Sequence, residues 1–155
     1  MNTRRITWIL LIGTLSLQAA MADGIQQAPA LAIYNSECAS CHMAYPPALL
    51  PSASWQRIMG SLNKHFGVDA SLDAVNQQKI TQWLTNNSAK GRKANLLPIQ
   101  DRITKSEWFL RQHNSHEVPA AVWKRQSVGS PSNCTACHAN ATQGDFEEHN
   151  VRIPK

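Results

Sequence analysis

Two five-residue stretches decide how this chain folds. They read Cys38-Ala39-Ser40-Cys41-His42 and Cys134-Thr135-Ala136-Cys137-His138. Each places two cysteines three positions apart and a histidine directly after the second cysteine, and together they use all four cysteines of the 155-residue chain. Residues three positions apart share one face of a helical turn. Each pair of thiols can therefore bond to one planar group while the adjacent histidine projects beside them.

This C-x-x-C-H pattern indicates attachment of c-type haem, with the two thiols forming thioethers and the histidine serving as proximal iron ligand. Three other uses of the cysteines fit less well. A disulfide framework needs no histidine after each pair, and a thioredoxin-like motif needs a βαβ pattern that is not visible here. A Cys₄ zinc site usually has its cysteine pairs closer together and leaves His42 and His138 unexplained. We therefore predict two covalently bound haem c groups, attached through four cysteines: Cys38, Cys41, Cys134 and Cys137.

The first 22 residues are typical of a segment for export. Arg4 and Arg5 form a positive start, Ile6 to Leu17 is mostly apolar, and Ala20-Met21-Ala22 fits a small-x-small cleavage site. We expect a secretory signal peptide cut after Ala22 and hence a periplasmic protein. The alternative is an uncleaved anchor, but the apolar run is short for a membrane span.

Composition excludes several classes of protein. With 43% hydrophobic residues and five tryptophans the chain is not disordered. The formal net charge is +5, but two of these charges belong to the export segment, and the propionates of two haems would offset most of the rest. We therefore do not expect nucleic acid as a partner. No small-molecule substrate is expected either.

Four further histidines could supply the sixth ligands of the two irons: His65, His113, His116 and His149. Apolar residues with helical spacing across residues 54–66 predict an amphipathic helix that points His65 toward the core. In a chain that holds haem, this favours His65 as the sixth ligand of the first iron. Met59 lies on the same predicted face and is the thioether alternative.

A second predicted helix covers residues 105–115 and leads to the other candidate ligands. His113 and His116 follow Phe109 at i+4 and i+7, so both can share its apolar side. We favour His113 as the sixth ligand of the second iron, because it continues the face made by Phe109 and Leu110, and His116 is the alternative. His149 follows two glutamates near the C-terminus, and we expect it to be exposed.

The chain is expected to be all-α, since strand-like alternation is nearly absent. A third predicted helix covers residues 72–85, with Ser71 as N-cap, and a polar linker follows at residues 86–92. The predicted organisation is a signal peptide at 1–22, an N-terminal haem domain at 23–90 and a C-terminal haem domain at 91–155. The second domain is expected to be mostly irregular with few helices.

Several stretches resemble the small bacterial dihaem cytochromes c. In the first half they are Glu37 to His42, Tyr45-Pro46-Pro47, Leu49-Leu50-Pro51, Ser54-Trp55 and His65 to Leu72. In the second half they are Arg102-Ile103-Thr104, Pro119 to Trp123, Ser130 to Cys134, Gly144-Asp145-Phe146 and Val151 to Pro154. Together they extend over nearly all of the chain after residue 22.

This resemblance implies bis-His ligation of both irons and a role in electron transfer. We expect a periplasmic carrier of single electrons that performs no catalysis. The resemblance also implies a class I cytochrome c-like N-terminal part and a less regular C-terminal part. The resemblance further implies two redox partners: a small oxygen-binding monohaem cytochrome and a membrane b-type cytochrome. By position His42, His65 and His138 match the family's ligands. The alternative function is a dihaem peroxidase- or reductase-like enzyme with one open iron, and a haem module that only senses or docks is a third class.

Overall fold

The computed structural model describes residue 25 and residues 27–155, so the predicted signal peptide lies outside the described residues. Four α-helices are present in this part: α1 Ala32–Cys38, α2 Ser52–Met59, α3 Ala74–Asn86 and α4 Glu107–Gln112. The remaining elements are short 3₁₀ helices: η1 Pro47–Leu49, η2 Leu62–Lys64, η3 Gly91–Asn95, η4 Ile99–Asp101, η5 Ile103–Lys105, η6 Val122–Lys124, η7 Cys134–Ala136, η8 Ala141–Gln143 and η9 Glu148–Asn150. None of the described helices is long and apolar enough to cross a membrane. The expected all-α class is confirmed.

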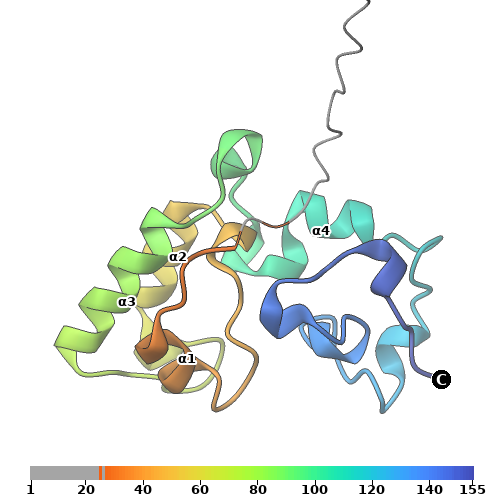
Figure 1. Cartoon of the computed structure of the whole chain (residues 1–155), viewed down its shortest axis with the longest axis horizontal. Coiled ribbons are helices and arrows are strands. Elements are labelled where there is room, and N and C mark those ends of the chain that lie inside the picture. Colours follow the sequence, from red (N-terminus) through yellow and green to blue (C-terminus); the bar gives the residue numbers. More distant parts are fainter. Residues whose placement is uncertain (1–24, 26) are drawn as a thin grey trace, which may run out of the picture.

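The helices α1, α2 and α3 gather on one side of the molecule, with α4 and the C-terminal segment on the other (Figure 1). They enclose one buried cluster, which consists of Tyr34, Leu50, Trp55, Met59, Leu62, Ile80 and Leu84. Burying side chains of this size is the main force that stabilises a small fold. The cluster keeps α2 against α3 and fixes α1, which ends at Cys38, the first haem-attachment cysteine.

The second half of the chain has little apolar core of its own. Beyond residue 100 only four buried hydrophobic residues occur in the described part: Phe109, Val122, Val128 and Ala141. Its backbone is mostly turns and 3₁₀ segments, as expected for the C-terminal part. So little buried surface does not offset the conformational entropy of ordering this segment. A large apolar group must therefore complete its interior.

Three predicted helices differ from those in the structure. The predicted helix at residues 54–66 ends early, because α2 stops at Met59 and Gly60 follows with its low helix propensity. The third helix begins at Ala74, and its N-cap is Asp73, whose carboxylate accepts a hydrogen bond from the Asn76 amide. The N-cap prediction for Ser71 is wrong, because its hydroxyl donates to Asp69 instead.

The predicted helix at residues 105–115 is also shorter in the structure. It begins after Ser106, whose hydroxyl oxygen accepts a hydrogen bond from the Phe109 amide, and it ends at Gln112. His113 is the C-cap residue, and the Asn114 side chain donates to the Arg111 carbonyl. The side-chain amide competes with helical hydrogen bonding and so ends the helix.

Candidate haem sites

The first candidate site brings together His42 and His65. His42 follows the attachment cysteines at the end of α1, and His65 comes directly after η2. Their ring centroids lie 6.1 Å apart, with the ring planes 31° from parallel. The two imidazoles thus face each other, although the whole of α2 lies between them in the sequence.

The second candidate site brings together His138 and His113. Their ring centroids are also 6.1 Å apart, and their planes are 64° from parallel. The ring of Phe146 lies 5.3 Å from the ring of His138, and Trp123 lies 6.0 Å from the ring of His113. Aromatic side chains therefore surround the second pair of histidines.

The separation of 6.1 Å suits an iron between the two rings of each pair. A metal–imidazole bond is about 2 Å long and the ring centre lies about 1.1 Å beyond its nitrogen, so two axial imidazoles on one metal have centroids about 6.2 Å apart. In the described part of the chain no group of three or more His, Cys, Asp or Glu residues could hold a metal ion. A haem iron needs only two protein ligands of this kind, because the porphyrin supplies the other four.

Main-chain carbonyls fix one histidine of each pair in the orientation for metal binding. The Nδ1 atom of His42 lies 2.7 Å from the Met43 carbonyl oxygen, and that of His113 lies 3.1 Å from the Phe109 carbonyl oxygen. Because a carbonyl only accepts, Nδ1 carries the proton and donates it. Nε2 is then the free ligand atom, the arrangement that orients most metal-binding histidines.

Burial favours the neutral form of three of these rings, and the neutral imidazole is the form that binds a metal. Desolvation is the largest cause that lowers the pKa of His65, followed by the charges of His42 and Arg102. Desolvation likewise lowers the pKa of His113 and of His138. The surroundings of the two sites therefore suit neutral ligands.

The four cysteines lie next to these histidines in the chain, and none of the four forms a disulfide. Burial is the main cause that raises the pKa of Cys38 and of Cys134 to about 11 in each case. A sulfur atom in such apolar surroundings is neutral, which matches the thioether it would form with a haem vinyl group. The donor set of both sites thus fits covalent haem.

A cavity of about 380 Å³ opens beside His113, within the range usual for ligand sites. Its apolar lining includes Phe109, Leu110 and Trp123. Arg102 and Lys105 also line it, and both are cations suited to the carboxylates of haem propionates. The cavity thus offers apolar walls for a macrocycle and charges for its acidic edge.

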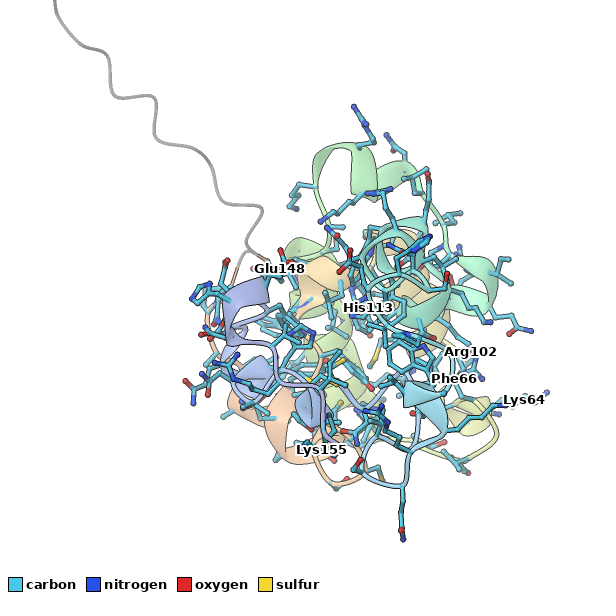
Figure 2. The ribbon with its side chains drawn as sticks, turned by 90° about the vertical axis from the view of Figure 1, so that its right-hand side faces the viewer. Lys64, Phe66, Arg102, His113, Glu148 and Lys155 are labelled. Carbon is cyan, nitrogen blue, oxygen red and sulfur yellow. The ribbon has the colours of Figure 1, made fainter. Side chains whose placement is uncertain are left out.

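The turn after η2 determines where His65 points. His65 and Val68 form an isolated antiparallel bridge around Phe66 and Gly67, and both central residues have positive φ, 50° and 107°. Gly67 adopts this conformation without a steric penalty, whereas Phe66 does not. The guanidinium of Arg102 lies 4.3 Å from the centre of the Phe66 ring, and this cation–π contact stabilises the strained residue (Figure 2).

The remaining candidate ligands lie elsewhere. His116 and His149 are exposed, and the His116 amide donates to the Asn114 side chain in a turn after α4. Met59 belongs to the buried cluster between α2 and α3. The structure therefore brings His113 rather than His116 to His138. The charge of Arg102 and the ring of Phe109, 4.1 Å from the ring of His113, were not assigned a role from the sequence.

Comparisons with known proteins identify the family. Residues 34–146 match the family described as dihaem cytochrome c. A diheme cytochrome c structure from Shewanella baltica OS155 is 38% identical, covers 82% of this chain and 95% of its own, and superposes with a TM-score of 0.70. A structure of diheme cytochrome c from Rhodobacter sphaeroides is 39% identical, and the match covers 77% of this chain and 99% of that one, with a TM-score of 0.66. A second structure from the same organism is 38% identical, and the match covers 78% of this chain and 100% of that one, with a TM-score of 0.68. No curated protein matches the chain significantly.

The chain belongs to the dihaem cytochrome c family. It is a c-type cytochrome that carries two covalently bound haem c groups. The prediction of two haems and the resemblance to dihaem cytochromes c are both confirmed. The boundary between two haem domains at residue 90 stays a prediction.

Proposed function

We propose that this protein is a periplasmic carrier of single electrons in which both irons have two histidine ligands. The ligands are His42 and His65 at the first site, and His138 and His113 at the second. One observation carries the proposal: both pairs of rings are separated by the same 6.1 Å, the distance that two imidazoles on one iron require. With both histidines of a pair bound, neither iron would keep a face free for a substrate.

The haem irons supply the one-electron chemistry, and the chain controls the surroundings in which it occurs. The carbonyls of Met43 and Phe109 hold two imidazoles in fixed orientations, so coordination changes little when the oxidation state changes. Little reorganisation favours rapid electron transfer. Histidine in place of methionine also favours lower reduction potentials, because thioether ligation raises them.

Location and partners follow from the sequence and the family. The predicted signal peptide directs the chain to the periplasm, where bacterial c-type cytochromes generally occur. The partners we propose are redox proteins, and the family resemblance points to a small oxygen-binding monohaem cytochrome and a membrane b-type cytochrome. We propose electron transfer rather than catalysis, because each site pairs two histidines that would occupy both sides of its iron.

Spectroscopy and titration of the purified holoprotein test this proposal. We expect low-spin six-coordinate spectra from both haems, two reversible one-electron reductions for each chain, and no binding of CO to the reduced form. A high-spin haem that binds CO readily would overturn the carrier assignment and favour the enzyme with one open iron.

A further inference from the structure

Tyr45 contacts the first candidate haem site directly and is linked to the second through Ser132. Its ring is stacked against the ring of His42, with the centroids 4.8 Å apart and the planes 28° from parallel. Its hydroxyl donates a hydrogen bond of 2.8 Å to the carbonyl oxygen of Ser132. Ser132 belongs to the segment that precedes the second C-x-x-C-H stretch. One side chain therefore joins segments that are 87 positions apart in the chain.

The contact continues from Ser132 to the second site. The Sγ atom of Cys134 lies 3.7 Å from the same Ser132 carbonyl oxygen. When Cys134 is a thioether its sulfur no longer donates a hydrogen bond, but the two atoms remain in van der Waals contact. A continuous series of contacts thus runs from the proximal histidine of the first haem, through Tyr45 and Ser132, to an attachment sulfur of the second.

The backbone around Tyr45 is held firmly in place. Pro46 and Pro47 follow it and lack amide protons, so this loop has few ways of its own to form hydrogen bonds. Side chains from other elements hold its carbonyl groups. The Tyr34 hydroxyl donates to the Tyr45 carbonyl oxygen at 2.8 Å, and the Trp55 indole N–H donates to the Pro47 carbonyl oxygen at 2.7 Å. Donors on α1 and α2 therefore fix the phenol ring against His42.

We propose that Tyr45 is the bridge between the two haem sites, so that electron exchange between the haems depends on its ring and its hydroxyl. This inference rests on the proposed electron-carrier function. One electron leaves one iron and arrives at the other, and Tyr45 keeps its phenolic proton and is neither oxidised nor reduced. Its part is to provide stacked and hydrogen-bonded contact between the two sites.

Two substitutions divide the contributions of the ring and the hydroxyl. Tyr45→Phe keeps the ring on His42 but loses the hydrogen bond to Ser132, while Tyr45→Leu loses both. Trp108→Phe is the matched control. The Trp108 indole N–H donates to the Leu49 carbonyl oxygen of the same loop at 3.3 Å, so the substitution also removes a hydrogen bond from an aromatic side chain. Trp108 contacts neither His42 nor Ser132. All three variants are studied as holoproteins with both haems attached.

The rate of exchange is measured from the broadening of ferric haem methyl resonances in half-reduced protein by NMR. We expect Tyr45→Phe to slow exchange severalfold, Tyr45→Leu to slow it further, and Trp108→Phe to leave it unchanged. The EPR signal of the first haem should shift in Tyr45→Leu but not in Tyr45→Phe, since only the former removes the ring from His42. This second readout does not depend on electron exchange.

Two results would overturn the bridge. One is a Tyr45→Phe protein that exchanges electrons as fast as the unmodified protein, and the other is a Trp108→Phe protein that is slowed as much as Tyr45→Phe. The proposed function is tested separately by CO binding to the unmodified protein. A protein that binds no CO and shows equal rates in all variants would retain the carrier function and lose the bridge.

Discussion

The ring of His113 is stacked on the ring of Phe109, with the centroids 4.1 Å apart and the planes 11° from parallel. The main chain of Phe109 also contacts His113, because its carbonyl oxygen accepts a hydrogen bond from the imidazole Nδ1. One residue thus holds the histidine through both its ring and its backbone. This double contact explains why His113, and not His116, is oriented toward His138.

Phe109 should therefore contribute strongly to stability. Its side chain is only 6% exposed, so Phe109→Ala should lower the free energy of unfolding by about 3–5 kcal/mol. Val75→Ala is the control, since Val75 lies on α3 and is 60% exposed, and its effect should be within about 0.5 kcal/mol. Denaturant unfolding of the two holoproteins provides the comparison, and equal midpoints would contradict the role of Phe109.

The two haems should give different EPR signals. The imidazole planes are 31° from parallel at the first site and 64° at the second. Nearly parallel rings separate the energies of the iron d orbitals, whereas rings closer to perpendicular leave two of them nearly equal. We expect a rhombic low-spin ferric signal from the first haem and a more anisotropic one, with a larger maximum g value, from the second. Two identical signals would contradict the difference in ring angle between the two sites.

Arg102 should raise the reduction potentials of both haems. It contacts Phe66 beside His65 and lines the cavity beside His113. A unit positive charge about 10 Å from an iron, at an effective dielectric constant of about 40, disfavours the oxidised form by about 0.8 kcal/mol, or roughly 35 mV for one electron. Arg102→Gln should lower both potentials by tens of millivolts in a redox titration. Arg111 lies on the exposed face of α4. Arg111→Gln is the control and should leave both reduction potentials unchanged.

The ion pair between Arg57 and Asp101 should make stability depend on pH. Arg57 donates two hydrogen bonds to the Asp101 carboxylate, at 2.8 and 2.5 Å, and they are the main cause that lowers the pKa of Asp101. A lowered pKa in the folded state means that the unfolded chain binds the proton more readily. The stabilisation is therefore complete above the ordinary value of 3.8 and is lost as the pH falls through the lowered one.

Asp101→Asn should lower the denaturant midpoint slightly at pH 7 and have little effect near pH 2. Asn suits the left-handed backbone of this residue, whose φ is 55°, so the substitution removes the charge without adding strain. Glu107→Gln is the control, because its exposed pair with Arg111 has a separation of 4.0 Å. An Asp101→Asn protein with the same loss of stability at both pH values would contradict the account.

The local parts of both sites were predictable from the sequence. The C-x-x-C-H pattern is contiguous, so both attachment segments could be identified directly. His113 follows Phe109 by four residues, and that spacing predicted that both residues share one helical face. His65 was selected through a helix that the structure ends at Met59, so its position rests instead on the turn at Phe66 and Gly67.

The contacts between distant segments were not predictable. Tyr45 meets Ser132 and Arg102 meets Phe66 across long stretches of chain, and no periodicity in one sequence encodes such a pair. Phe146 lies beside His138 in a segment without regular structure, where hydrophobic patterning gives no signal. These residues are fixed by tertiary packing, which helical and capping rules do not describe.

The decisive test of bis-His ligation is the spin state of the haems in four histidine variants, compared by EPR under identical conditions. Bis-His ligation predicts that His65→Ala and His113→Ala each convert one of the two haems to a high-spin form, while His116→Ala and His149→Ala leave both haems low-spin. A high-spin haem in the His116→Ala protein, together with unchanged spectra in the His113→Ala protein, would contradict it.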